Sequence, residues 1–176
     1  LKWDISHVWA GTVNSVALAK TIGCNIHGGY SLNVTNTAAF EWYEQLGLTD
    51  LELSYELTLK QSAKIGGNLP RGLLLYGRLP LMLCRNCPGK NDGKNCKNCN
   101  GTTWLTDRKN IKFPVQCDYG CSEVLNAVPL TMSDRISDIS GMNFGTLRFT
   151  VENSVEIEET FQQFLYQKAP LGHYTR

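Results

Sequence analysis

The sequence has little net charge and lacks any long apolar run. Its 17 Lys and Arg residues nearly balance 16 Asp and Glu residues, which leaves a formal charge of +1 at pH 7. The global basic footprint of a nucleic-acid-binding domain is therefore absent. No apolar stretch approaches the roughly 18 residues of a membrane-spanning helix. The first five residues include Lys2 and Asp4 and lack the apolar core of a secretory signal peptide.

Common catalytic fingerprints are missing as well. The sequence shows no His-Glu-x-x-His pair, no phosphate-binding loop, no dinucleotide-binding glycine pattern and no serine-triad signature. Three histidines in 176 residues give little support to an ordinary zinc protease. Hydrophobic residues nevertheless make up 42% of the chain, which is enough for a real core. The chain begins with Leu1 rather than Met, which suggests a processed product or a piece of a longer chain.

The first part of the chain, residues 1–76, predicts alternating strands and short helices. We expect a helix over 14–22 that ends before Gly23, and a second helix that begins after Thr35 or Asn36 and ends at Leu46. Thr58 and Gln61 form a capping box for a third helix, which would end near Gly66. Strands are expected at 51–54 and at 72–76, the second of them apolar enough to be covered on both faces. This alternation predicts parallel βα units.

The remaining hundred residues predict an insertion followed by a return to the first pattern. Residues 77–126 form the insertion, with a small hairpin made by 104–107 and 112–115. Residues 127–176 predict a helix from Ser133 or Asp134 to Ile139, a strand at 145–151, and a helix from Ser154 to about Gln167. The fold class is therefore α/β, and 1–176 is expected to be one domain.

The cysteines are the most informative residues. Six of the seven fall between Cys84 and Cys121. An odd total and tight clustering argue against a secreted disulfide scaffold, and without a signal peptide they favour a reducing, cytoplasmic location. Residues 86–101 are mostly Asn, Lys, Gly and Cys, too polar to be ordered by core packing. We expect a thiolate-bound metal or cluster to order residues 86–121, with free surface thiols or local disulfides as the alternatives.

Six thiols are two more than one four-ligand site needs. Cys87 lies at the entrance of the polar loop, and Cys117 follows a strand-like stretch, so the preferred ligands are Cys87, Cys96, Cys99 and Cys117. Cys84 lies in an apolar run and is interpreted as a buried thiol, whereas Cys121 is an alternative to Cys117. The spacing does not separate zinc from an iron–sulfur cluster, because both accept four thiolates. Cys24 is expected to be a small buried group.

Several polar residues are weaker candidates. His27 stands at a strand end, where barrel enzymes place catalytic groups, but a histidine held in a turn is the simpler interpretation. Asn33 and Asn36 are interpreted as caps. Glu52 is expected on a solvated face, and Glu56 is a second candidate for a barrel mouth. Two sets of charges are interpreted as solvated: the turn residues Asp107, Arg108 and Lys109, and the basic run Arg71, Arg78, Arg85, Lys90, Lys94 and Lys97.

Seven short segments carry a family resemblance: HGGYSLNVTN (27–36), YGRLPLM (76–82), Cys87-Pro88, LTDRK (105–109), FPVQC (113–117), NAVPL (126–130) and Asp134-Arg135. In this order, from about residue 25 to 150, they resemble the collagenase-like peptidase family, number thirty-two of the unassigned peptidases. No single piece is specific, but the combination is.

The resemblance implies a (β/α) barrel, of which this chain is the later half plus the cysteine segment. It also implies an iron–sulfur cluster, 4Fe–4S as first choice, because Cys87, Cys96 and Cys99 fall at positions like those of the family's ligands. Members carry a peptidase label, yet several act in oxygen-independent hydroxylation of RNA bases or of a quinone precursor. The chain lacks the family's His-Gly-x-x-Cys stretch and the first strands of the barrel, so the fragment alone is expected to be inactive. The alternative is a non-catalytic module stapled by zinc.

A partial barrel has a consequence for association. An open parallel sheet would leave the side chains of Leu51, Leu53, Leu73 and Leu75 uncovered, each contributing roughly 1.5–3 kcal/mol when buried. We therefore expect either a two-fold homodimer that covers the sheet, or helices of the same chain that do so. The expected substrates of a full-length protein are RNA or a peptide, with no membrane partner.

Overall fold

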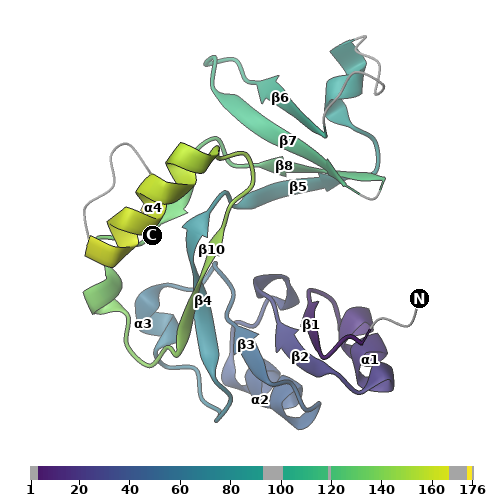
Figure 1. Cartoon of the computed structure of the whole chain (residues 1–176), viewed down its shortest axis with the longest axis vertical. Helices are drawn as coiled ribbons and strands as arrows, with labels where there is room; N and C mark the ends of the chain where they lie inside the picture. The colour runs from purple at the N-terminus through teal and green to yellow at the C-terminus, as the bar shows by residue number, and fades with distance from the viewer. Residues whose placement is uncertain (1–3, 93–100, 119, 167–173, 176) are drawn as a thin grey trace. The chain divides into compact units, whose positions relative to one another are not determined.

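The computed structural model describes residues 4–92, 101–118, 120–166 and 174–175 of a mixed α/β chain (Figure 1). The chain divides into two compact units. The first comprises Leu1–Leu75 and Arg135–Leu147, and the second comprises Tyr76–Asp134 and Arg148–Arg176. The expected insertion, 77–126, falls entirely in the second unit. No helix within the described ranges has the length and apolar character needed to cross a membrane.

The first unit is built on parallel strands. In chain order these are β1 (His7–Ala10), β2 (Asn25–Gly28), β3 (Asp50–Glu52) and β4 (Arg71–Gly77), the last of which continues into the second unit. Each pairs in parallel with the next. The strand β10 (Phe144–Arg148) pairs with β4, and the short 3₁₀ helix η4 (Ile136–Asp138) precedes it. Parallel βα units are thus confirmed for the first part of the chain.

Local capping signals set the helices of this unit. Helix α1 (Val13–Ile22) begins after Thr12 and ends at Gly23, whose φ of 72° suits glycine. Helix α2 (Thr37–Gln45) begins where Asn36 accepts a hydrogen bond from the Ala39 N–H at 2.8 Å. Helix α3 (Leu59–Ser62) has the predicted Thr58–Gln61 capping box but ends earlier than expected. A 3₁₀ turn, η1 (Tyr30–Leu32), follows β2.

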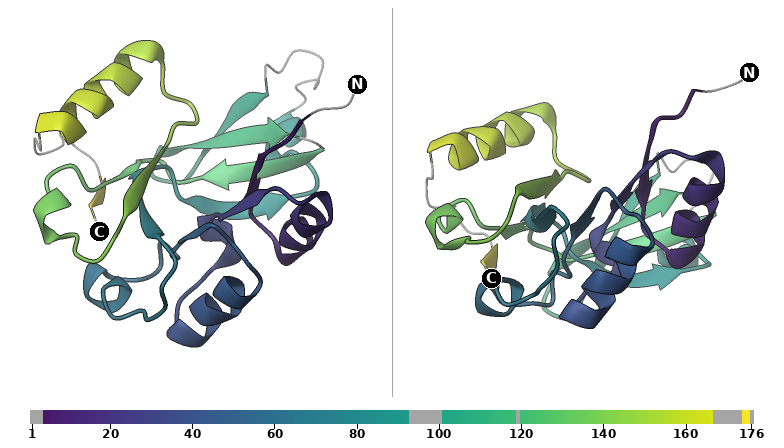
Figure 2. Two further views of the ribbon diagram at one scale, coloured as in Figure 1. Left: turned by 60° about the horizontal axis from the view of Figure 1, so that its bottom comes forward. Right: turned by 90° about the horizontal axis from the view of Figure 1, so that it is seen from below.

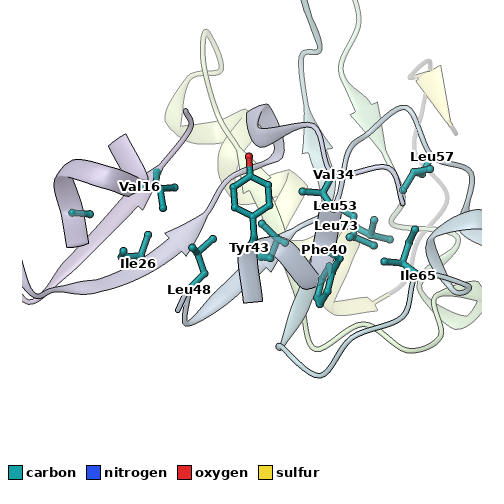
Figure 3. Close-up of a cluster of buried hydrophobic side chains, with 13 residues drawn as sticks. Val16, Ile26, Val34, Phe40, Tyr43, Leu48, Leu53, Leu57, Ile65 and Leu73 are labelled. Carbon is teal, nitrogen blue, oxygen red and sulfur yellow. The ribbon is translucent and has the colours of Figure 1, made fainter. Parts of the chain in front are cut away.

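The core of the first unit lies between its strands and its helices (Figure 3). Val16 of α1 and Phe40 of α2 pack in one cluster with Ile26, Leu53 and Leu73 of the strand segments. Leu51, Leu53 and Leu73 are at most 1% exposed, and Leu75 packs against the same cluster. Of the two expected ways of covering these leucines, the structure has the second, in which helices of the same chain pack against them. The reason given for a homodimer is thereby removed.

The second unit contains an antiparallel four-stranded sheet in the order β5-β8-β7-β6, labelled in Figure 1 and seen from two further directions in Figure 2. Its strands are β5 (Pro80–Cys84), β6 (Thr102–Thr106), β7 (Lys112–Asp118) and β8 (Cys121–Leu125). β6 and β7 form the predicted hairpin, closed by Asp107, whose Oδ1 accepts from the N–H groups of Lys109 and Ile111. The interpretation of Asp107 as a turn residue is confirmed. The 3₁₀ helix η2 (Pro88–Asp92) follows β5.

The rest of the second unit packs through aromatic and charged contacts. Helix α4 (Ser154–Tyr166) places Phe161 against Phe149, which in turn contacts Tyr76. The N-terminal cap of α4 is Asn153, one residue before the predicted Ser154. The Asn153 Oδ1 accepts hydrogen bonds from the N–H groups of Val155 and Glu156. Short strands β9 (Leu130–Thr131) and β11 (Tyr174–Thr175) pair in parallel, and β9 runs antiparallel to the end of β4.

The described strands do not close into a barrel. The helix expected between residues 133 and 139 is reduced to η4, with Arg135 before its first residue. The fold is therefore a mixed α/β chain with one sheet containing parallel strands and a separate antiparallel sheet.

Candidate metal centre

Two of the four predicted ligands lie in the described part of the second unit, and they lie together. Cys87 precedes η2, and Cys117 is near the end of β7. The two thiols are within hydrogen-bonding contact, although 30 positions separate them in the sequence. Cys96 and Cys99 lie outside the described residues. Within the described ranges, no three His, Cys, Asp or Glu side chains gather closely enough to hold a metal ion by themselves.

The Cys87 sulfur accepts hydrogen bonds from side chains and from backbone N–H groups. Burial raises the pKa of its thiol, but hydrogen bonds to the thiolate from Cys117, from the Gly89 N–H, from Ser122 and from the Lys90 N–H together lower the pKa below its ordinary value. The turn is closed by the Lys90 N–H, which donates to the Cys87 carbonyl at 3.1 Å. The turn therefore favours the thiolate, which is the form of cysteine that can bind a metal.

Glycine at position 89 is required by close packing. A Cβ added there would lie 2.5 Å from the Thr103 side chain of β6. The turn that carries Cys87 is therefore held against the hairpin that carries Cys117. Two segments distant in the sequence are fixed at one place by strand pairing and by this contact.

Ser122 is the site residue that the sequence did not reveal. In the register of the sheet it pairs with Cys117 on one side and with Cys84 on the other. The Ser122 Oγ is 3.2 Å from the Cys117 sulfur. Paired residues of neighbouring strands project from the same face, so Cys84, Ser122 and Cys117 form a row across three strands. Nothing near Ser122 in the sequence indicates that it lies beside two cysteines, because this proximity depends on the register of the strands.

The same register separates Cys121 from the row. Cys121 precedes Ser122 in β8, and successive side chains of a strand point to opposite faces. Cys121 pairs instead with Asp118 near the β7–β8 turn. Of the two clustered cysteines left out of the preferred set, Cys84 shares a face with Cys117 and Cys121 does not. Cys84 is half-buried at the end of β5.

Cys24, Asn33 and Asn36 have structural roles in the first unit. Cys24 is partly buried against the core of the first unit, and its sulfur is 3.4 Å from the Ala19 carbonyl oxygen, as a small packed side chain should be. The described cysteines are all free thiols. Both asparagines are caps, as predicted: Asn36 precedes α2, and Asn33 ends η1 in a left-handed conformation with φ of 53°. Its Oδ1 accepts from the Ser54 hydroxyl at 2.6 Å.

The solvated-face interpretation of Glu52 is wrong. Glu52 is 0% exposed, and its Oε2 accepts a hydrogen bond from the Tyr30 N–H at 3.1 Å. The turn that follows β2 supplies this donor, which is why a carboxylate is tolerated there. Glu56 is exposed, and its N–H donates to Ser54 Oγ. His27 contacts Asp50 and His7, two partners that the sequence analysis did not single out.

Two members of the basic run are not solvated charges, which corrects the prediction for them. The Arg71 guanidinium donates to the carbonyls of Ile65 and Gly67 and lies 4.5 Å from the centre of the Phe40 ring. Arg78 forms an ion pair with Glu152, with 3.3 Å between Nε and Oε1. Both guanidinium groups therefore have partners within the protein, whereas Arg85 and Lys90 are exposed. Lys94 and Lys97 lie outside the described residues.

Comparison with protein-family models, with curated proteins and with solved structures gives no match to this chain.

Proposed function

We propose that Cys87, Cys96, Cys99 and Cys117 bind a metal centre, and that the chain is part of a protein of the collagenase-like peptidase family. The centre proposed first is a 4Fe–4S cluster. It would support redox chemistry of the kind used in oxygen-independent hydroxylation of RNA bases or quinone precursors, or hydrolysis as the family's peptidase label implies. The proposal places the protein in the cytoplasm, where thiols stay reduced.

The meeting of Cys87 and Cys117 carries this proposal. Two thiols from separate elements, one with its thiolate form favoured, supply half of a four-sulfur shell. Four N–H, S–H or O–H donors aimed at one sulfur are also the groups that tune the potential of a cluster. Burial and hydrogen bonding of this kind are unnecessary for a thiol that only fills space.

The sequence tethers a third ligand to the same place. Gly101 accepts a hydrogen bond from the Cys117 N–H at 2.7 Å. Cys99 stands two positions before Gly101, and two residues of extended chain span at most about 7 Å. We therefore propose Cys99, together with Cys96 three positions earlier, as the remaining ligands.

The first unit supports the barrel part of the proposal. Its four parallel strands, with helices packed against them, are the elements that a segment of a (β/α) barrel wall would require. The polar residues His27, Asp50 and Glu52 alternate with the buried Ile26 and Leu51, so they belong to the other face. In a full-length protein this face would line the barrel and meet the RNA or peptide substrate.

The alternative is a zinc ion that staples a non-catalytic module. Cys87 and Cys117 are only partly buried, and the sequence between them is rich in Asn, Lys and Gly. Such surroundings offer little apolar shielding, which a structural zinc ion does not need. The two centres use the same ligands and differ in their elemental content.

Ligand substitution tests the proposal in the intact, anaerobically purified chain. Each of the variants Cys87→Ser, Cys96→Ser, Cys99→Ser and Cys117→Ser should lose the bound metal, measured by elemental analysis. Cys24→Ser is the matched control and should keep it, as should Cys121→Ser, which projects from the opposite face of β8. Full metal content in Cys117→Ser together with its loss in Cys121→Ser would contradict the site described here.

A further inference from the structure

Three titratable side chains of the first unit form a continuous hydrogen-bonded chain. His27 Nδ1 lies 2.7 Å from Asp50 Oδ2, and His27 Nε2 lies 2.8 Å from His7 Nδ1. The residues come from the three neighbouring strands β1, β2 and β3. Strand register fixes them, since His27 pairs with Asp50 on one side and with Trp9, two residues after His7, on the other.

The donors and acceptors of this chain can be assigned in only one order while both rings are neutral. An ionised carboxylate only accepts, so His27 must donate from Nδ1 to Asp50. The Nε2 atom of a neutral His27 then carries a lone pair and accepts. His7 must therefore donate from Nδ1, and its own lone pair is left on Nε2. His7 is an exposed residue, so this lone pair belongs to the solvent-accessible end of the chain.

The orientation of the two rings indicates that His7 and His27 are hydrogen-bonded to each other and are not ligands of one metal ion. The ring planes of His7 and His27 are inclined by 20°, and their centres are 5.1 Å apart. The two hydrogen-bonded nitrogens are 2.8 Å apart, so the distance between ring centres is longer by about two ring radii. Each ring centre therefore lies on the line through the two nitrogens, and the rings meet edge to edge and nearly in one plane. The nitrogen lone-pair directions therefore point along the line between the rings. Two ligands of one metal ion would instead point at a common third position.

We propose that Asp50, His27 and His7 form a general acid–base site for hydrolysis of ester-type substrates, with His7 Nε2 as the base. His7 takes a proton from a water molecule at Nε2, and the proton on its Nδ1 passes to Nε2 of His27. The positive charge then lies on His27, beside the Asp50 carboxylate. The hydroxide adds to the acyl carbon, the bond to the leaving oxygen breaks, and the reverse transfer returns the proton to that oxygen.

Asp50 and His27 are positioning residues in this scheme. Asp50 selects the His27 tautomer, and His27 selects that of His7. The site is independent of the cysteines, because its three residues belong to the first unit. It can therefore be tested without regard to which metal the second unit binds.

Tautomer measurement tests the assignment directly. The chain has three histidines, His7, His27 and His173, so the ring signals can be assigned with two variants. Long-range ¹H–¹⁵N NMR should show the proton on Nδ1 in both His7 and His27, the form that free histidine disfavours. In Asp50→Asn the amide can donate to Nδ1, so both rings should change to the Nε2–H form. Rings that stay in the Nε2–H form in the unmodified protein overturn the proposal.

Hydrolysis of p-nitrophenyl acetate by the intact chain tests the activity. His7→Ala and Asp50→Asn should lower the rate by about a hundredfold, the lower end of general acid–base contributions, and the rate should fall in D₂O. The cysteine thiols are common to all variants, so they do not affect the comparison, and His173→Gln is the matched control. An unchanged rate in His7→Ala overturns the proposal. So does Ni²⁺ binding that requires both His7 and His27, which would indicate a metal site.

Discussion

The packing of Phe40 allows the stability of the first unit to be tested with a worked magnitude. Phe40 of α2 is 0% exposed, and Gly67, at a φ of 101°, lies so close that an added Cβ would be 2.3 Å from the ring. Replacing a buried Phe by Ala costs about 3–5 kcal/mol. The Arg71 guanidinium lies 4.5 Å from the ring centre, and a cation–π contact of this kind contributes about 0.5–1 kcal/mol. We expect Phe40→Ala to lower the free energy of unfolding by about 3.5–6 kcal/mol, the sum of these two contributions.

Trp42 provides a matched control on the same helix. It is 46% exposed, two positions away, and contacts Tyr43 at its edge. Trp42→Ala should cost less than about 1.5 kcal/mol, because surface substitutions remove little buried area. Urea denaturation followed by circular dichroism measures both variants. A loss below about 2 kcal/mol in Phe40→Ala, or an equal loss in the two variants, would refute the packing described for this core.

Three further predictions follow from the second unit. Asn153→Ala should destabilise α4 by about 1 kcal/mol, whereas Ser154→Ala should not; thermal unfolding distinguishes them, and the reverse order would restore Ser154 as the cap. Burial, followed by the Glu152 charge, raises the pKa of Tyr76 above its ordinary value of 10.0. The free energy of unfolding should therefore be unaffected by this group below pH 10 and should fall as the pH rises through the pKa of the folded state. Denaturation measured from pH 9 to 12 should show this fall in the unmodified chain and not in Tyr76→Phe, and identical profiles would contradict the prediction. Metal removal should expose residues 86–101 to proteolysis and leave the first unit helical; an unchanged cleavage pattern after proven removal would contradict the proposed ordering role.

Local signals predicted where α2 and α3 begin, and they predicted the hairpin. The Thr58–Gln61 box and the Asn36 cap are contacts between side chains and backbone three residues apart, so the sequence contains both partners. The β6–β7 hairpin follows in the same way from Asp107 and the turn after it. Ser154 was predicted as a cap in place of Asn153 because both residue types cap helices, and only the backbone conformation distinguishes neighbouring positions.

Register and burial could not be predicted, because they depend on residues far apart in the sequence. The row of Cys84, Ser122 and Cys117 exists only because β8 lies between β5 and β7. Glu52 is an acidic residue next to leucines, and nothing in the sequence says that a backbone N–H from the turn after β2 reaches it. The partners of His27 are likewise 20 and 23 positions away.

The central claim is that clustered cysteines bind a metal centre, and its elemental content tests the claim most directly. Iron, acid-labile sulfide and zinc should be measured in the anaerobically purified chain, with an absorbance spectrum of the same sample. The account predicts a brown protein with four iron and four sulfide per chain, or, for the alternative, a colourless protein with one zinc. A chain that contains neither iron nor zinc after anaerobic purification and reconstitution would contradict it.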